Sequence, residues 1–200
     1  MWEERFAASD AYVFGTEPAR FLVEHRAYLG SDQKALSIAD GEGRNSVYLA
    51  EHGLDVTALE FAPSAIVKAR DLARQRGVAV KYRNCNILTE NWTEPDTYDL
   101  VVAIFVQFTG PDGRKRQFDG MKQSCKPGGL IFIHGYTPKQ LEFGTGGPPF
   151  AENMYTEVQM RADFSGWDIV QCCAYEREVQ EGRGHSGMSA LLDFVVRKPA

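Results

Sequence analysis

The chain has no long apolar run and no excess of positive charge. Its longest apolar stretch, Leu100 to Val106, is far below the roughly 18 residues of a membrane span. The residues after Met1 also lack the basic and apolar regions of a signal peptide. Asp and Glu (27) outnumber Lys and Arg (22), for a formal net charge of -5, which gives no general attraction to nucleic acid or an anionic membrane. We therefore expect a cytosolic protein with a small or neutral substrate.

Cysteine is scarce, and its spacing is uninformative. The four cysteines form no CxxC pair: Cys85, Cys125, Cys172 and Cys173. Isolated cysteines in a cytosolic chain are more often free thiols than disulfides or metal ligands. We expect free thiols and no bound metal.

Length and apolar content set the number of domains. At 200 residues with 44% hydrophobic residues, the chain is long enough for one well-filled core and short for two. We predict a single domain over residues 1–200.

Strands and helices alternate over the first two thirds of the chain. A first helix is predicted from Thr16-Glu17-Pro18, with Thr16 as the N-cap, to about Leu29. Strands are then predicted at 34–39, 54–60, 78–84, 100–106 and 130–134, with helices at 44–52, 63–76 and 112–125. Repeated β-α-β units form a parallel sheet, and the continuous apolar strand 100–106 belongs at its centre.

The pattern changes after residue 134. The Gly- and Pro-rich segment Gly135 to Phe150 has the composition of a loop, and its length indicates function. A helix near 156–163 precedes two strand-like runs, 167–179 and 188–197, with a short glycine-rich link between them. Such a pair is most simply an antiparallel hairpin.

Three polar elements follow the first three predicted strands. Gly41 and Gly43 allow a tight turn and the close approach of a ligand, next to the free N–H groups of a helix start. Glu60 has nearly the spacing of an acid that accepts hydrogen bonds from ribose hydroxyls. Asn86 can accept from an adenine amino group, and Ile87 can cover a ring face. Each alone also fits an ordinary turn, strand end or loop, but ligands of open α/β sheets bind at this edge.

Together these residues resemble the Rossmann-like S-adenosylmethionine (SAM)-dependent methyltransferases over nearly the whole chain. Five landmarks carry the resemblance: the glycine loop at 36–45, Glu60, Asn86-Ile87, Tyr98-Asp99-Leu100-Val101 and Lys126-Pro127-Gly128-Gly129. The resemblance implies an α/β fold, a single domain with a mostly parallel seven-stranded sheet, helices on both faces and a C-terminal antiparallel hairpin. Residues 1–30 are then an N-terminal lid and helix, 34–134 the cofactor-binding core, and 135–200 the substrate loop and hairpin.

Within that family, the chain is most similar to small tellurite-resistance-type methyltransferases. The similarity lies in the lead Tyr12 to Pro18, the loop Gly41 to Asn45 and the segment Gly182 to His185.

Three positions depart from the family pattern. Ser37 and Asn86 replace aspartates, and Ala39 replaces the first glycine. Ala39 should be tolerated if its φ is negative, and Asn86 still accepts a hydrogen bond, without charge assistance. The acid missing at Ser37 normally helps to hold the loop and the methionine amino group, and Asp40 is the residue able to replace part of that role.

The resemblance implies SAM as cofactor and S-adenosyl-L-homocysteine as product. The implied cofactor-binding residues are Ala39, Asp40, Gly41, Gly43, Glu60, Phe61, Asn86, Ile87 and Ile104.

Methyl transfer from a sulfonium mainly requires alignment of the acceptor and exclusion of water. A thiolate or a selenium or tellurium oxyanion needs no base, whereas a protonated acceptor does. The candidate catalytic residues are His185, Tyr136 and Gln107, and the candidate substrate-pocket residues are Tyr12, Phe14, Phe108 and His134. Their alternative roles are lid packing for Tyr12 and Phe14, a strand cap for Gln107 and an exposed turn for His185.

Three other functions compete with that of a small-molecule methyltransferase, which we expect to be a monomer or homodimer. A nicotinamide-dependent oxidoreductase is disfavoured by Ser46 at the place of a third glycine and by the late hairpin. A nucleic-acid methyltransferase is disfavoured by the acidic charge and by the segment Ile104 to Phe108, which lacks the Asn/Asp-Pro-Pro-aromatic motif. A non-catalytic SAM-binding protein stays open because of Ser37 and Asn86.

Overall fold

The computed structural model describes residues 2–182 and 185–200, with the side chain of His185 outside that description. The chain divides into two compact units. The first comprises Met1–Asn91 with Glu181–Gly184, and the second comprises Trp92–Gln180 with His185–Ala200. The single domain predicted from length therefore stays a prediction. Among the described helices, none combines the length and the apolar character that a membrane crossing requires.

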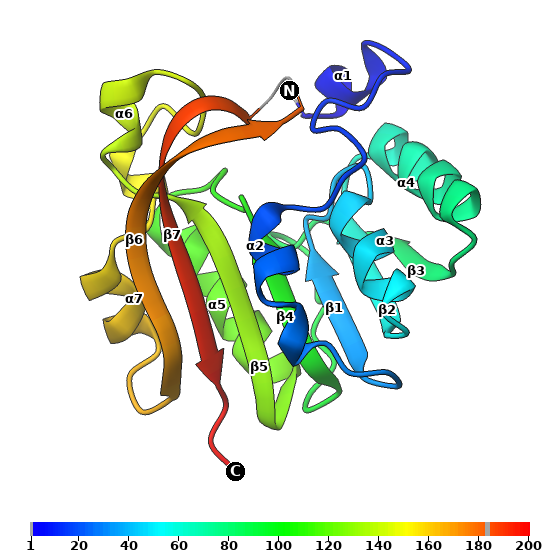
Figure 1. Cartoon of the computed structure of the whole chain (residues 1–200). Helices are drawn as coiled ribbons and strands as arrows, with labels where there is room; N and C mark the ends of the chain where they lie inside the picture. The colour runs from blue at the N-terminus through cyan, green and yellow to red at the C-terminus, as the bar shows by residue number, and fades with distance from the viewer. Residues whose placement is uncertain (1, 183–184) are drawn as a thin grey trace. The chain divides into compact units, whose positions relative to one another are not determined.

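The first unit contains a parallel three-stranded sheet in the order β3-β2-β1 (Figure 1). In this register Ile38 pairs with Leu59, and Glu60 pairs with Asn84. The carboxyl ends of the three strands thus meet at one edge. The elements of this unit are α1 (Trp2–Ala7), α2 (Arg20–Glu24), η1 (Arg26–Tyr28), β1 (Lys34–Ile38), α3 (Arg44–Glu51), β2 (Asp55–Glu60), α4 (Pro63–Arg76) and β3 (Val80–Asn84).

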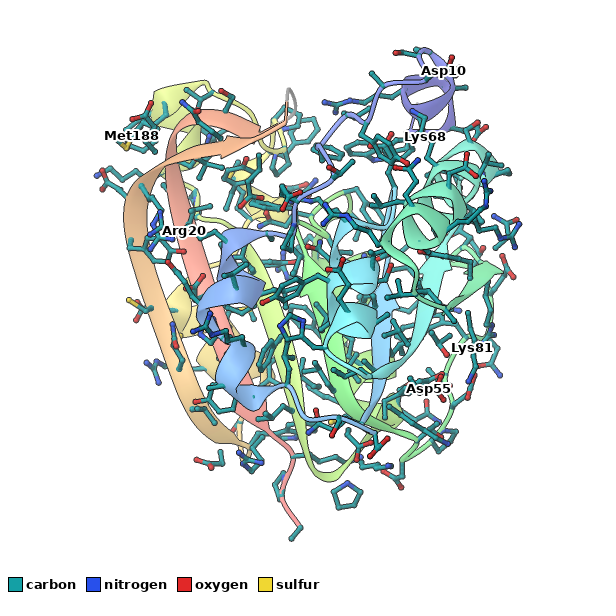
Figure 2. All side chains as sticks on the ribbon, turned by 45° about the vertical axis from the view of Figure 1, so that its right-hand side comes forward. Asp10, Arg20, Asp55, Lys68, Lys81 and Met188 are labelled. Carbon is teal, nitrogen blue, oxygen red and sulfur yellow. The ribbon has the colours of Figure 1, made fainter. Side chains whose placement is uncertain are left out.

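Helix α4 has the bounds that the sequence predicts. Pro63 occupies the first turn, where a missing N–H costs nothing, and Gly77 ends the helix in the left-handed conformation with φ of 70°. Ile66, Ala69 and Leu72 are buried on one face. At the outer edge of the sheet, Lys81 of β3 pairs with Asp55 of β2 (Figure 2).

The second unit has the strand order β4-β5-β7-β6. β4 and β5 are parallel, whereas β7 runs antiparallel to β5, with Ile133 opposite Phe194. The α/β class, the mostly parallel strands and the antiparallel C-terminal hairpin are confirmed. The elements of this unit are β4 (Tyr98–Ile104), α5 (Pro111–Ser124), β5 (Cys125–Tyr136), α6 (Gln140–Phe143), η2 (Ala151–Asn153), α7 (Glu157–Asp163), β6 (Asp168–Glu181) and β7 (His185–Arg197).

Two sequence predictions about the first helix are wrong. The helix does not run unbroken to Leu29 but divides into α2 and η1, and its N-cap is Ala19 instead of Thr16. The backbone N–H of Ala19 donates to Oδ1 of Asn45 at 2.9 Å. A tertiary hydrogen bond therefore replaces the local cap that Thr16 was expected to provide.

The segment 135–150 is more ordered than the predicted loop. β5 continues to Tyr136, and α6 follows within the segment. Gln140 on α6 accepts from Ala190 N at 2.9 Å and donates to Thr145 Oγ1 at 3.0 Å. Helix α1 was also not predicted. The four cysteines are free thiols, as expected.

Candidate functional site

The glycine loop after β1 turns through three left-handed residues. Gly41 has φ of 64°, Gly43 has φ of 90°, and Ala39 has φ of 47°. The condition under which Ala39 was expected to be tolerated, a negative φ, is therefore not met. A left-handed alanine costs about 1 to 2 kcal/mol, so the loop is strained where the family places glycine.

Gly43 is required for packing as well as for backbone conformation. A Cβ at Gly43 would lie 2.7 Å from Cβ of Ala69 on α4, whereas one at Gly41 would meet only Phe6 Cζ at 3.7 Å. The loop thus approaches α4 so closely at Gly43 that no side chain fits.

Asp40 is buried inside the loop, with 8% of its surface exposed. Its carboxylate accepts hydrogen bonds from Ser37 Oγ at 2.7 Å and from Ser46 Oγ at 2.5 Å. Burial raises the pKa of Asp40, while the hydroxyl hydrogen bonds from Ser46 and Ser37 oppose that rise. The carboxylate of Asp40 therefore joins the end of β1 to the start of α3, which is the loop-holding role expected of it in a chain with Ser37.

Glu60 closes β2 beside the glycine loop and is 5% exposed. Its Oε2 accepts from Gly41 N at 2.8 Å, and its Oε1 accepts from Ala62 N at 2.9 Å. Burial raises the pKa of Glu60, and the negative charge of Asp40 adds to the rise. The backbone N–H of Phe61 also lowers the pKa of this group, so three N–H donors orient it. Since a carboxylate has about four acceptor positions, it keeps capacity for a ligand.

The segment after β3 lies against the end of β2. The Asn84 side chain donates to the carbonyl oxygen of Phe61 at 2.7 Å. Asn86 has its Oδ1 engaged by Leu88 N at 3.0 Å, in a tight turn. Ile87 is buried, whereas Phe61 is 40% exposed. Of the predicted cofactor-binding residues, all but Ile104 thus belong to the first unit, at one edge of its sheet.

The N-terminal segment of residues 2–18, called the lead from here on, also lies over this edge. Phe6 and Phe14 pack edge to face, with 6.4 Å between their ring centroids. Tyr12 contacts α4, because its hydroxyl donates to the Lys68 carbonyl oxygen at 3.0 Å. Figure 2 shows Lys68 on α4 beside the part of the lead that carries Asp10. The lead is therefore fixed to the unit that carries the glycine loop.

In the second unit, Gln107 pairs with the backbone of Tyr136. Its Nε2 donates to Tyr136 O at 2.8 Å, and its Oε1 accepts from Tyr136 N at 2.7 Å. These bonds give Gln107 a structural role in holding the end of β5. A direct role in catalysis stays a prediction, as it does for Tyr136, which is 1% exposed.

His134 and Asp193 form a buried pair in the second unit. They face one another across β5 and β7, with Nδ1 of His134 2.7 Å from Oδ1 of Asp193. The Tyr175 hydroxyl donates to the same oxygen at 3.1 Å. Phe105, left-handed with φ of 57°, packs its ring edge to face on His134 at 4.8 Å. Strained non-glycine residues often occur at functional sites.

For the remaining predicted site residues, the structure gives a position in the fold but no contact that indicates a role. Phe108 is 38% exposed after β4. Ile104 ends β4 in the second unit. His185 begins β7, but its side chain is outside the described part of the chain. Within residues 2–182 and 185–200, no group of three or more His, Cys, Asp or Glu side chains is arranged to hold a metal ion.

Sequence reasoning gave no role to three buried charged residues. Glu42 and Arg44 flank Gly43. Two charged residues inside a glycine turn are unusual, and this feature of the sequence could have indicated that they have a role. Asp193 lies in an otherwise apolar strand, Ala190 to Val196, where a single acid is itself a signal.

Part of the chain is similar in sequence to known methyltransferases. Residues 35–129 match the model of a family described as a methyltransferase domain. The ubiquinone biosynthesis O-methyltransferase of Pectobacterium carotovorum subsp. carotovorum (strain PC1) is 30% identical over 105 residues. The alignment covers 50% of this chain and 42% of the relative, so less than half of that protein's length is matched.

Solved structures share the fold over nearly the whole chain. TehB from Haemophilus influenzae aligns with a TM-score of 0.73 and 19% identity, over 98% of this chain and 67% of its own. The N-methyltransferase NodS from Bradyrhizobium japonicum WM9, in complex with S-adenosyl-L-homocysteine, aligns with a TM-score of 0.71 and 18% identity, over 100% of this chain and 97% of its own. At these identities the likeness establishes the fold.

Proposed function

We propose that this protein transfers a methyl group from SAM to a small-molecule acceptor. The proposal is supported by the match of residues 35–129 to the model of a methyltransferase domain and by the fold that the chain shares with the N-methyltransferase NodS. The observation that carries the proposal is the buried Glu60 carboxylate, held by Gly41 N–H at the carboxyl edge of the sheet. Its orientation suits a ribose hydroxyl pair, whose two O–H groups donate to one carboxylate.

The charge of the site also favours SAM over a nicotinamide dinucleotide. Burial raises the pKa of both Asp40 and Glu60, so the ionised carboxylates are costly without a positive partner. SAM carries a sulfonium and an ammonium group, which lower that cost. A pyrophosphate placed on this loop would bring negative charge to two buried acids.

The two ends of the cofactor are proposed to occupy different parts of the edge. The methionine end contacts the turn formed by Ala39, Asp40, Gly41 and Gly43. The adenine end contacts the segment after β3, where Asn86 Oδ1 retains a second lone pair. The exposed ring of Phe61, which follows β2, offers it a stacking surface. Ile87 is proposed to contribute apolar contacts to the base, and a cofactor-binding role for Ile104 stays a prediction.

On the acceptor side, the His134–Asp193 pair supports an acceptor that arrives protonated. Asp193 holds one ring nitrogen of His134, which fixes the orientation of the imidazole. The name of the curated relative adds a hydroxyl group to the candidate acceptors, beside a thiol or a selenium or tellurium oxyanion. The other proposed acceptor-side residues are Tyr12, Phe14, Gln107, Phe108, Tyr136 and His185.

An acceptor screen with mass measurement tests this function. The protein is incubated with SAM and, separately, with phenols, thiols, selenite, tellurite and small amines or acids. A product heavier by one methyl group, with formation of S-adenosyl-L-homocysteine, is the expected result. Tight SAM binding without transfer to any acceptor in the panel would favour a non-catalytic SAM-binding protein.

A further inference from the structure

Two oppositely charged residues flank Gly43 in the glycine loop. Glu42 is 4% exposed and Arg44 is 6% exposed. The turn itself requires glycine, not charge, and a buried charge is costly unless it is paired. Each of the two side chains has its partners in a segment that is distant along the sequence.

Glu42 binds the N-terminal lead. Its Oε2 accepts from the backbone N–H of Val13 at 2.7 Å, with Phe14 N further away at 3.5 Å. Its Oε1 pairs with Lys68 Nζ at 2.9 Å, and the same ammonium donates to Ala11 O at 3.0 Å. The carboxylate thus connects the glycine loop to backbone groups of residues 11–14.

Arg44 binds the end of β6. Its Nη2 lies 2.8 Å from Oε2 of Glu181, an ion pair whose geometry falls outside that of a hydrogen bond. The two side chains are 7% and 13% exposed. The other oxygen of Glu181 accepts from Arg20 N, at the start of α2, at 3.0 Å. The guanidinium therefore connects the glycine loop to a segment more than a hundred residues away.

The lead and the end of β6 also contact one another directly. A Cβ at Gly182 would lie 2.4 Å from the carbonyl carbon of Phe14 and 2.6 Å from Gly15 N. Only glycine fits where these two backbones meet. Three contacts therefore join three segments in a ring, which we call the circuit. Glu42 connects the glycine loop to the lead, the lead contacts Gly182, and the adjacent Glu181 pairs with Arg44 of the glycine loop.

We propose that Glu42 and Arg44 are positioning residues that make the lead and the end of β6 respond to occupation of the glycine loop. A ligand held against residues 40–43 narrows the conformations of the loop and so fixes the directions of both side chains. Amide exchange in the lead and at residues 181–182 is then slowed when the ligand binds. This inference rests on the proposed function, because the ligand is SAM or its product.

Hydrogen exchange with S-adenosyl-L-homocysteine tests the circuit without an acceptor. Binding is first measured by calorimetry, and amide exchange is then followed with and without saturating ligand. In the unaltered protein the ligand should slow exchange at Val13, Phe14 and Glu181 by about tenfold. Glu42→Ala should lose the effect at Val13 and Phe14, while Glu42→Gln, which keeps an acceptor for Val13 N–H, should restore part of it.

A second variant acts from the far end of the circuit. Glu181→Gln leaves the glycine loop sequence intact and should lose the effect at residues 180–182 alone. Glu24→Gln is the matched control, since it removes a carboxylate from the exposed Arg20–Glu24 pair of the same unit, and it should respond as the unaltered protein does.

The outcomes separate this inference from the proposed function. Absence of a binding signal with both SAM and S-adenosyl-L-homocysteine would overturn both. A normal binding signal with unchanged exchange at Val13, Phe14 and Glu181 would overturn the circuit alone. Equal protection of these amides in Glu42→Ala, Glu181→Gln and the unaltered protein would do the same.

Discussion

Gly43 lies so close to Ala69 that a Cβ on the glycine would be 2.7 Å from the Cβ of the alanine. This distance is well below van der Waals contact, and the φ of 90° at Gly43 independently disfavours a side chain. The glycine loop is therefore fixed against α4 by packing, and its conformation depends on a residue in the middle of that helix.

Gly43→Ala should lower the free energy of unfolding by about 3 kcal/mol, from overpacking and backbone strain together. Gly41→Ala should cost about 1 kcal/mol, because only its backbone is strained. Chemical denaturation measures both changes. Adding Ala69→Gly to Gly43→Ala should recover only a small part of the loss, because the Cα of residue 69 would still lie 2.8 Å from the new Cβ. Equal stability of Gly43→Ala and Gly41→Ala would show that the contact with α4 is not the cause.

Ala39→Gly should raise the free energy of unfolding by about 1 kcal/mol, because glycine adopts φ of 47° without strain. Denaturation midpoints measure this gain. A neighbouring alanine, Ala35, lies in a regular strand and is not among the left-handed residues, so Ala35→Gly is the control and should destabilise. A loss of stability in Ala39→Gly would mean that residue 39 is not left-handed in solution.

Stability should depend on pH through Asp40. Burial raises the pKa of Asp40 above its ordinary value of 3.8 in the folded, ligand-free protein. The folded state therefore favours the protonated form of Asp40. The stabilisation that this form provides is fully present below about pH 4 and is lost as the pH rises through the folded-state pKa. Asp40→Asn removes this loss, so the melting temperature of the variant relative to the unaltered protein should be higher at pH 8 than at pH 4.

The same substitution should weaken SAM binding, since it removes a negative charge that a cationic ligand offsets. Thermal melts from pH 4 to 8, with and without SAM, measure both effects. A melting difference that does not change with pH, or that falls as the pH rises, would contradict the placement of an ionised Asp40 in the buried loop.

Asp193→Asn should lower kcat by about a hundredfold while leaving SAM affinity unchanged, if His134 takes a proton from the acceptor. The substitution alters the hydrogen bond that orients the imidazole. Tyr175→Phe is the control, because it removes a donor to the same carboxylate without changing the His134 contact. Steady-state kinetics on the acceptor found by the screen decides the point, and equal kcat values for all three proteins would assign the pair to structure.

The predictable parts of the fold are those with local signals. Helix α4 was predicted with the observed bounds because Pro63, Gly77 and a one-sided apolar pattern are all local. The first helix was not, because the backbone of Ala19 is bound by Asn45, which no local pattern reveals. The length of β5 was also underestimated, since Lys126 to Gly129 reads as a turn and belongs to the strand.

In the candidate site, too, residues with a local sequence signal were predicted and residues defined by distant contacts were not. Glycines at fixed spacing and an acid at a strand end identified Gly41, Gly43 and Glu60 from the sequence. The partners of Glu42 could not be identified in this way, because Val13 contributes its backbone N–H and any residue type but proline supplies one. The left-handed Ala39 was missed because its residue type argues against that conformation.

Calorimetric titration with SAM, and separately with NADH, tests whether the edge formed by the glycine loop and Glu60 binds SAM. We expect a binding signal from SAM and none from NADH, and we expect Glu60→Gln to weaken SAM binding by about 1 to 3 kcal/mol through lost ribose hydrogen bonds. Glu24→Gln should bind SAM as the unaltered protein does. A signal from NADH with none from SAM, or an unchanged affinity in Glu60→Gln, would rule out a SAM site at Glu60.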